Sequence, residues 1–142
     1  MNPPVQAGWF SGKLPEGLGV RDGRLKPCPD TPNCVSSQDR GSASLAPIAY
    51  RGGASAAWQR LTTIVETMPR TTVTQRTGNY LRAEASSRLL GFVDDVEFLL
   101  DENAGVIQVR SASRLGYSDL GVNRRRVEQI RALFDGEETA AK

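Results

Sequence analysis

The feature that most limits how this chain can fold is the spacing of its apolar residues, which becomes regular from Ile48 onward. Two stretches repeat apolar residues at helical spacing, and five short segments alternate or are rich in β-forming residues. The segments expected as strands are Ile48–Tyr50, Thr71–Arg76, Tyr80–Ala85, Phe92–Leu100 and Val106–Ser113. The order β-α-β-β-β-β-α predicts an α+β fold, with one mostly antiparallel sheet and two helices packed on one of its faces.

Both helices are predicted from their apolar stripes. The stripe of the first helix consists of Trp58, Leu61, Ile64, Val65 and Met68. Ser55 is its expected N-cap, and Pro69 is its expected stop. The stripe of the second helix consists of Val127, Ile130, Leu133 and Phe134.

The first third of the chain shows no sustained period, and most of the prolines lie before Pro47. Scattered apolar residues, among them Leu18, Leu25 and Val35, argue against full disorder. We therefore expect three parts: residues 1–45 as an irregular arm that packs on the domain, 46–135 as the α+β domain, and 136–142 as a disordered tail.

Composition excludes several classes of function. The 142 residues include no histidine, which excludes Ser-His-Asp and Cys-His nucleophile pairs and every zinc site that needs imidazole. We expect no metal and no cofactor, because neither a Walker loop nor a dinucleotide fingerprint is present. A net charge of +2, with acids interleaved among the arginines, is not typical of nucleic-acid binding. No apolar run could span a membrane and the N-terminus lacks the regions of a secretory signal, so we expect a cytoplasmic protein.

Three consecutive arginines, Arg124, Arg125 and Arg126, stand where the second helix is predicted to begin. The first turn of a helix carries partial positive charge, and each cation there costs about 0.3–1 kcal/mol in an isolated helix. A negative group is therefore expected nearby, either a carboxylate of the chain or an anionic ligand.

One candidate for this negative group is Asp94, which interrupts the apolar face of its predicted strand. For that face to coincide with the apolar face of the next strand, Asp94 must lie opposite Ser111 or Ser113. A buried acid needs partners. Either Asp94 ties the hairpin to the arginine-rich helix start, or it faces a polar ligand together with Arg114 and an arginine of the triplet.

The loop between the last strand and the second helix contains glycines, hydroxyls and an acid, a combination that suits anion binding. Asp119 in this loop has a simpler alternative role as the helix cap. The candidate ligand-binding residues are Asp94, Ser111, Ser113, Arg114, Tyr117, Ser118, Asp119, Asn123, Arg124 and Arg125.

Cys28 and Cys34 enclose two prolines and an asparagine, which favour a turn between them. The alternatives are a structural pair, either bonded or as thiols, a redox pair, and a metal site completed by Asp30.

Three motifs resemble those of a known family: Leu18–Gln38, Gly91–Phe98 and Val109–Arg126. The chain resembles the domain of unknown function 1499 family over roughly Leu18 to Phe134. The resemblance implies a single small domain of a kind found in bacteria and plastids, and it supplies no activity, substrate or catalytic residue. Relatives in this family often carry export or membrane segments, which favours a disulfide between Cys28 and Cys34.

Three functional hypotheses follow. The first is a small domain that binds a small anionic or polar ligand in the region of Asp94, Arg114 and Arg124–Arg126. The second is a protein-interaction or assembly module that uses the N-terminal arm. The third is a histidine-independent acid/base enzyme in which Asp94 or Asp95 is the base and Arg114 steadies an oxyanion. We favour the first and rank the enzyme last.

Overall fold

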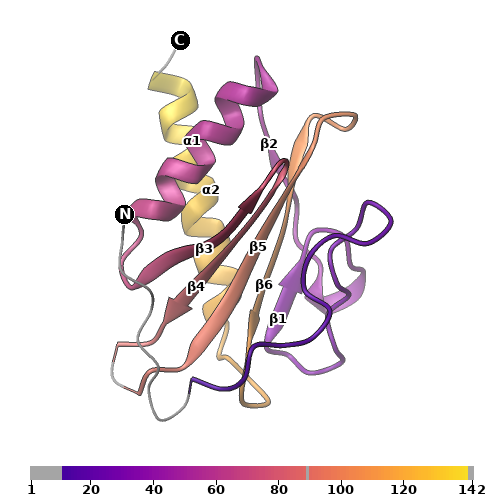
Figure 1. Cartoon of the computed structure of the whole chain (residues 1–142), viewed down its shortest axis with the longest axis vertical. Helices are drawn as coiled ribbons and strands as arrows, with labels where there is room; N and C mark the ends of the chain where they lie inside the picture. The colour runs from indigo at the N-terminus through magenta and orange to yellow at the C-terminus, as the bar shows by residue number, and fades with distance from the viewer. Residues whose placement is uncertain (1–10, 89, 141–142) are drawn as a thin grey trace.

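The structure is a computed structural model that describes residues 11–88 and 90–140 (Figure 1). The strands are β1 (Cys34–Ser36), β2 (Ile48–Ala49), β3 (Thr71–Thr77), β4 (Tyr80–Ser86), β5 (Val93–Asp101) and β6 (Val106–Ser113). The helices are α1 (Ala54–Thr67) and α2 (Val122–Ala140), with a short 3₁₀ helix at Gly41–Ala43. The predicted α+β fold with one mostly antiparallel sheet is confirmed.

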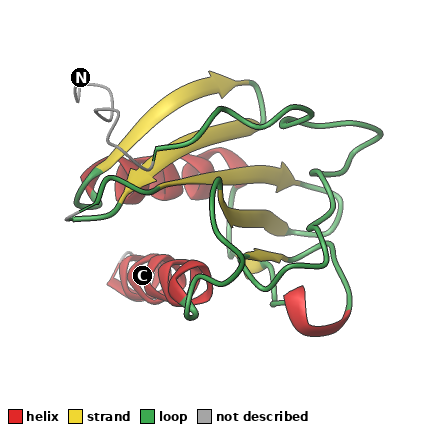
Figure 2. Cartoon of the chain, turned by 90° about the horizontal axis from the view of Figure 1, so that it is seen from below, coloured by secondary structure: helices red, strands yellow, loops and turns green. Residues whose placement is uncertain are grey.

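The strands form one sheet in the order β1-β6-β5-β4-β3, and β2 pairs with a further stretch of β6. Strands β3, β4 and β5 each pair with the next strand in sequence, as short connections favour. Both helices lie against the same face of this sheet (Figure 2). At one end of the sheet β4 finishes, β5 begins and β6 leads into α2. We call this the loop end, and it lies at the bottom of Figure 1.

The main core lies between the helices and one face of the sheet. Alternate residues of β4, β5 and β6 point into it, because successive side chains of a strand face opposite sides. Its fully buried members include Leu61, Leu81, Phe98, Ile107 and Phe134. Burying one such side chain contributes roughly 1.5–3 kcal/mol, and many of them fix the two layers together.

The opposite face of the sheet is covered by the N-terminal segment. Leu25 packs against Tyr80 and Leu99 in a second apolar cluster, and the Gly19 N–H donates to Glu97 Oε2 (2.9 Å). This segment belongs to the expected arm, of which residues 1–10 lie outside the described part. The arm also contains β1, which pairs with β6. Strand β1 is only three residues long, so no alternation in the sequence revealed it.

Helix α1 differs from its prediction at its start. Its N-cap is Gly53, which makes no side-chain cap hydrogen bond, and the expected cap Ser55 lies inside the first turn. The reason is that the Ala57 N–H already bonds to the Gly53 carbonyl (3.1 Å), so the helical ladder begins earlier than the serine.

Helix α2 differs from its prediction along its length. Leu133, expected on the apolar stripe, is exposed, whereas its neighbour Phe134 is fully buried. The helix also continues to Ala140, through residues expected in the disordered tail at 136–142. Glu138 connects this last part to the domain, because it accepts hydrogen bonds from the Arg51 N–H (2.9 Å) and the Arg60 guanidinium (3.0 Å).

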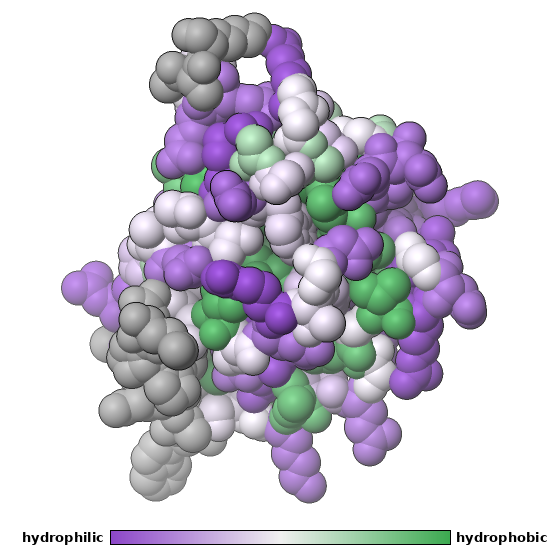
Figure 3. All heavy atoms as spheres, turned by 45° about the horizontal axis from the view of Figure 1, so that its top comes forward, coloured by the Kyte–Doolittle hydropathy of each residue, from purple (hydrophilic) through white to green (hydrophobic). Residues whose placement is uncertain are grey.

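No helix within residues 11–88 and 90–140 is long and apolar enough to cross a membrane. On the face seen in Figure 3, hydrophobic residues occur as separate small areas between hydrophilic ones. Scattered exposed apolar residues are ordinary on a folded protein.

Candidate functional site

The three arginines at the start of α2 have three different surroundings. Arg126 forms an ion pair with Asp94 (Nη2–Oδ2, 2.7 Å) and also donates to Ser111 Oγ (3.2 Å). Asp94 lies opposite Ser113, one of the two positions that the register argument predicted. The ion pair confirms Asp94 as a counter-charge, and one cation of the triplet is neutralised inside the protein.

A buried asparagine connects the polar atoms around this ion pair. Asn123 is fully buried; its side chain accepts a hydrogen bond from Ser111 Oγ (2.6 Å) and donates to Ser113 Oγ (2.9 Å). Its backbone N–H and its side-chain amide both donate to Asp119, at 3.1 and 2.7 Å. Asp119 also accepts the N–H of Gly121 (2.8 Å), so it caps α2, which is the simpler of its two expected roles.

The acidity of Asp119 follows from this cap. Partial burial by itself would raise the pKa of Asp119, but hydrogen bonds from Asn123 and from the backbone N–H of Asn123 and Gly121 outweigh burial and lower the pKa. The carboxylate is therefore charged at neutral pH. A negative charge at this position is favourable to the helix start, so it offsets part of the cost of the arginines that follow.

Arg114 lies on the other face of the sheet from Asp94, and the expectation that the two line one pocket is wrong. Asp94 and its partner Ser113 are a cross-strand pair near the core, so the residue after Ser113 turns to the opposite face. There Arg114 donates to Asp95 through Nε (2.8 Å) and to Glu84 through Nη2 (2.8 Å). The hydrogen bond to Asp95 outweighs burial and raises the pKa of Arg114.

The outer face of the sheet carries a network of paired charges. Its members are Glu84, Asp95, Glu97, Arg82, Arg110 and Arg114. Glu97 also accepts a hydrogen bond from Tyr80 Oη (2.6 Å). Burial, and then this hydrogen bond, raise the pKa of Tyr80 well above its usual range. Asp95 is paired in this network and Asp94 is paired with Arg126, so both candidate bases of the enzyme hypothesis are engaged in ion pairs.

Arg124 and Arg125 form no ion pair with any residue that the structure describes. Arg124 donates to the Ser42 carbonyl (2.8 Å), and Arg125 donates to the Leu120 carbonyl (2.9 Å). Their side chains line two different pockets. These two guanidiniums are therefore the members of the triplet that keep charge available for a group from outside.

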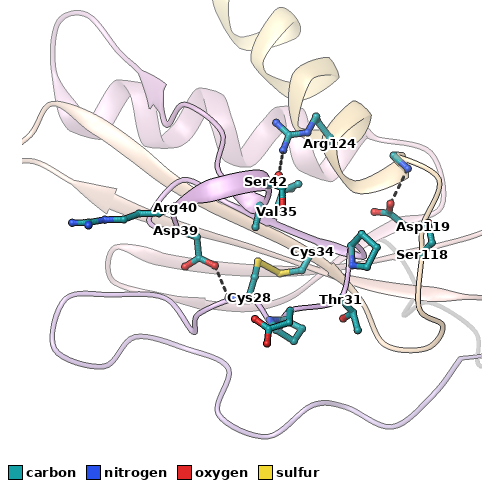
Figure 4. Close-up of a pocket in the computed structure, with 15 residues that line it drawn as sticks. Cys28, Thr31, Cys34, Val35, Asp39, Arg40, Ser42, Ser118, Asp119 and Arg124 are labelled. Carbon is teal, nitrogen blue, oxygen red and sulfur yellow. Dashed lines mark hydrogen bonds between the residues drawn. A yellow bond between two sulfur atoms is a disulfide. The ribbon is translucent and has the colours of Figure 1, made fainter.

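The larger pocket, of about 390 Å³, lies beside a disulfide between Cys28 and Cys34 (Figure 4). We call it the disulfide pocket. Its charged lining residues are Asp30, Asp39, Asp119, Arg40 and Arg124. Carboxylates outnumber guanidiniums here, although Asp119 is occupied by the helix cap and Asp39 accepts the Cys28 N–H (2.7 Å).

Cys28 and Cys34 form a disulfide, which is one of the alternatives that the sequence left open. Within the described residues there is no group of three or more His, Cys, Asp or Glu side chains that could hold a metal ion.

A second pocket, of about 280 Å³, lies at the loop end and has a different chemistry. It is lined by Met68, Pro69, Arg70, Thr71, Ala85, Ser86, Val122, Arg125, Arg126 and Gln129. We call it the arginine pocket, because three guanidiniums and no carboxylate stand among the described residues that line it. Arg126 is neutralised by Asp94, whereas Arg70 and Arg125 form no ion pair with a described residue.

Two residues at the arginine pocket have a left-handed backbone conformation. Besides glycines, only Asp22, Arg70 and Leu120 have positive φ among the described residues, with φ of 51° at Arg70 and 54° at Leu120. This conformation costs roughly 1–3 kcal/mol in a side-chain-bearing residue and persists only where the surroundings hold it. The Ser86 N–H holds the first by donating to the Arg70 carbonyl (3.0 Å), and Arg125 holds the second through the Leu120 carbonyl.

Residues 24–134 match a model of the family described as protein of unknown function, DUF1499. The match covers most of the chain and every residue that lines either pocket. The chain belongs to the DUF1499 family. A comparison with curated proteins gave no match.

The structure of this DUF1499 domain distributes the ten candidate residues over five places. Asp94, Ser111, Ser113 and Asn123 form the network around Arg126; Arg114 lies on the outer face; Ser118, Asp119 and Arg124 line the disulfide pocket; Arg125 lines the arginine pocket; and Tyr117 is exposed. Only the first set contains residues, Asp94 with Ser111 and Ser113, that the strand register predicted to lie together.

The pocket residues that sequence reasoning missed come from distant parts of the DUF1499 domain. Arg70, Ser86 and Gln129 line the arginine pocket, and Asp39, Arg40 and Ser42 line the disulfide pocket. Arg70 had one weak signal, because it directly follows the proline that ends the first predicted helix. Nothing in the sequence marked the others.

Proposed function

We propose that this DUF1499 domain binds a small anionic ligand in the arginine pocket. The observation that carries the proposal is the composition of the lining: three guanidiniums together with the hydroxyls of Thr71 and Ser86, and no carboxylate. Guanidinium groups bind carboxylate and phosphate oxygens through paired, charge-assisted hydrogen bonds. A partly enclosed pocket strengthens such bonds, because the effective dielectric there is lower than in water.

The arginine pocket suits an anion better than the disulfide pocket does, although it is smaller. The disulfide pocket places three carboxylates beside two guanidiniums, and a carboxylate near the ligand repels an anion. In the arginine pocket, Arg125 donates to a backbone carbonyl, and neither Arg70 nor Arg125 forms an ion pair with a described residue. We therefore give the chemistry of the lining more weight than the volume.

The size of the arginine pocket limits the ligand. A volume of about 280 Å³ lies at the lower end of the range for small-molecule sites. It fits a compact group such as a phosphate, or a carboxylate with a few carbon atoms, and the apolar side chains of Met68 and Val122 give such carbon atoms a surface to contact.

Binding of inorganic phosphate and of citrate tests the proposal, using isothermal titration calorimetry at low salt, where surface charges are least screened. Arg125→Gln is expected to weaken binding about 10- to 100-fold, because a charge-assisted hydrogen bond contributes roughly 1.5–3 kcal/mol. Arg124→Gln is the matched control. It removes the same charge one residue away, but its side chain lines the disulfide pocket, so binding should change by less than about threefold.

Two outcomes contradict the proposal. One is wild-type protein that binds neither phosphate nor citrate. The other is a larger loss of affinity in Arg124→Gln than in Arg125→Gln, which would move the ligand to the disulfide pocket.

A further inference from the structure

Large apolar side chains are exposed together at the loop end. In the loop between β6 and α2, Leu120 is 84% exposed, Tyr117 is 71% exposed and Val122, at the first position of α2, is 39% exposed. In the neighbouring turn between β4 and β5, Leu90 is 53% exposed. Exposed apolar groups that gather in one region mark an interaction site more often than scattered ones do.

Two of these residues, Leu120 and Val122, adjoin the arginine pocket. Val122 lines the pocket, and Arg125 donates to the carbonyl of Leu120. A Cβ added at Gly121 would lie 2.9 Å from Arg125 Nη1, so the loop backbone packs closely against the guanidinium. The exposed leucine and the cationic pocket are therefore parts of one surface.

The charge of this surface is positive. Arg70, Arg88 and Arg125 lie at the loop end and form no ion pair with a described residue. Of the nearby carboxylates, Asp94 is paired with Arg126, whereas Asp119, which caps α2, keeps its negative charge and offsets one of these three guanidiniums. We call Leu90, Tyr117, Leu120 and Val122, together with Arg70, Arg88 and Arg125, the loop-end surface.

We propose that the loop-end surface docks onto a bilayer that contains anionic phospholipid. This inference rests on the proposed function, because the lipid phosphate would occupy the arginine pocket. Leu120 and Tyr117 would enter the headgroup region, where an aromatic ring with a polar tip and an aliphatic side chain are both favoured. Arginines that flank them are attracted to the negative surface of such a bilayer.

The shape of the surface favours a bilayer over a protein groove. Leu120 and Tyr117 project from a loop instead of lining a cleft, and a fluid bilayer accepts protruding side chains without a complementary cavity. The left-handed backbone at Leu120 (φ 54°) is a conformation that leucine rarely adopts. The Leu120 side chain nevertheless gains little burial within the domain.

Co-sedimentation of the full chain with vesicles tests the inference, using phosphatidylcholine alone or with a third of phosphatidylglycerol. Wild-type protein is expected to bind the anionic vesicles and to release them at high salt. Leu120→Asn is expected to reduce binding about tenfold, because burying a leucine side chain favours binding by roughly that factor or more. Asparagine tolerates a positive φ better than leucine does, so this variant is expected to fold.

Two control variants separate the lipid from the free anion. Leu133→Gln removes an exposed leucine of α2 outside the loop-end surface and should bind vesicles as wild type does. Leu120→Asn should retain phosphate binding in solution, whereas Arg125→Gln should lose both phosphate and vesicle binding.

Three outcomes would overturn the inference. Vesicle binding that is equal in Leu120→Asn and wild type would exclude the loop. Phosphate binding without vesicle binding would leave the proposed function intact and remove the bilayer. Absence of vesicle binding together with self-association that depends on Leu120, measured by analytical ultracentrifugation, would assign the surface to a protein partner. Vesicle binding that depends on Leu120 without any phosphate binding would contradict the proposed function and, with it, the placement of the lipid phosphate in the arginine pocket.

Discussion

The start of α2 is set by single residues whose polar atoms are almost all occupied inside the protein. Asn123 is the centre of this arrangement, because its amide connects Asp119, Ser111 and Ser113 while its backbone N–H is capped by Asp119. A buried amide left without partners would cost about 1–3 kcal/mol. The network thus fixes the helix start on β6 and neutralises Arg126, whereas Arg124 and Arg125 line pockets without an ion pair to a described residue.

Asp119, the cap of α2, gives a prediction at the scale of a single residue. Asp119→Ala should lower the free energy of unfolding by about 1 kcal/mol at neutral pH, measured by urea denaturation. The folded protein lowers the pKa of Asp119 below its unfolded value of 3.8. Its charged form therefore stabilises the fold fully above that value, and the contribution is lost as pH falls through the folded pKa.

The pH dependence provides the control for this prediction. The difference in stability between wild type and Asp119→Ala should be constant from pH 7 to about pH 5 and should shrink as pH falls below 3.8. A difference that grows on acidification would contradict the role of the charged carboxylate.

Among the elements, the β5–β6 hairpin contacts a different part of the molecule on each of its two faces. One face joins the core with α1 and α2, and the other carries the paired charges beneath the N-terminal segment. Strand β1 extends the same sheet by pairing with β6, and the disulfide closes the turn that leads into β1. The disulfide pocket exists because this turn is held beside the loop before α2.

The turn that leads into β1 gives a prediction about its disulfide. A Cys28→Ser, Cys34→Ser double variant should unfold with a free energy lower by roughly 2 kcal/mol, because the closed loop is short and the entropic effect of a disulfide grows with loop length. Urea denaturation of the variant and of wild type, each with and without reductant, measures the difference.

Phosphate affinity is the internal control, because the arginine pocket contains no residue of the disulfide turn. It should not change in the double variant, and a large loss would contradict the separation of the two pockets. The disulfide also bears on location. A cytoplasmic protein was expected from the sequence and stays a prediction, whereas disulfides persist mainly in oxidising compartments.

At the scale of the whole molecule, buried charges hold the N-terminal segment and the sheet together. Glu97 is fully buried and accepts hydrogen bonds from Gly19, Tyr80 and Arg110. Arg110 is also buried, and its Nε has no hydrogen-bond partner within the described residues. Such a pair adds little net stability when intact, because desolvation offsets the attraction between the charges, but breaking it leaves a buried charge uncompensated.

This network gives a prediction about the whole fold. Arg110→Met should lower the free energy of unfolding by about 3–5 kcal/mol, because it leaves the Glu97 charge without its cation. The double variant Glu97→Gln, Arg110→Met should recover at least half of that loss, since the uncompensated charge is then absent. Urea denaturation of both variants measures whether the double variant is more stable than the single one. Equal stability of the two would contradict the role of the uncompensated charge.

The order of elements and the register of the hairpin were predictable from the sequence. They depend on the local alternation of side chains along a strand. Because the apolar faces of neighbouring strands must coincide, Asp94 had to lie opposite Ser111 or Ser113, and in the structure it lies opposite Ser113. The cap role of Asp119 also followed from its position just before an amphipathic stretch.

Only the tertiary structure decided which residues share a pocket. Arg70 follows α1, Ser86 ends β4 and Arg125 belongs to α2, and no period in the sequence relates them. They meet because the sheet and helices pack their apolar faces together, and burial of apolar surface does not specify in advance which polar residues are left at the edge. For the same reason the adjacent arginines Arg124 and Arg125 enter different pockets, since successive residues of a helix point in different directions. The sequence by itself thus determined the layers and the need for a counter-charge near the arginine triplet. Packing determined which arginine is neutralised and where the remaining positive charge is exposed.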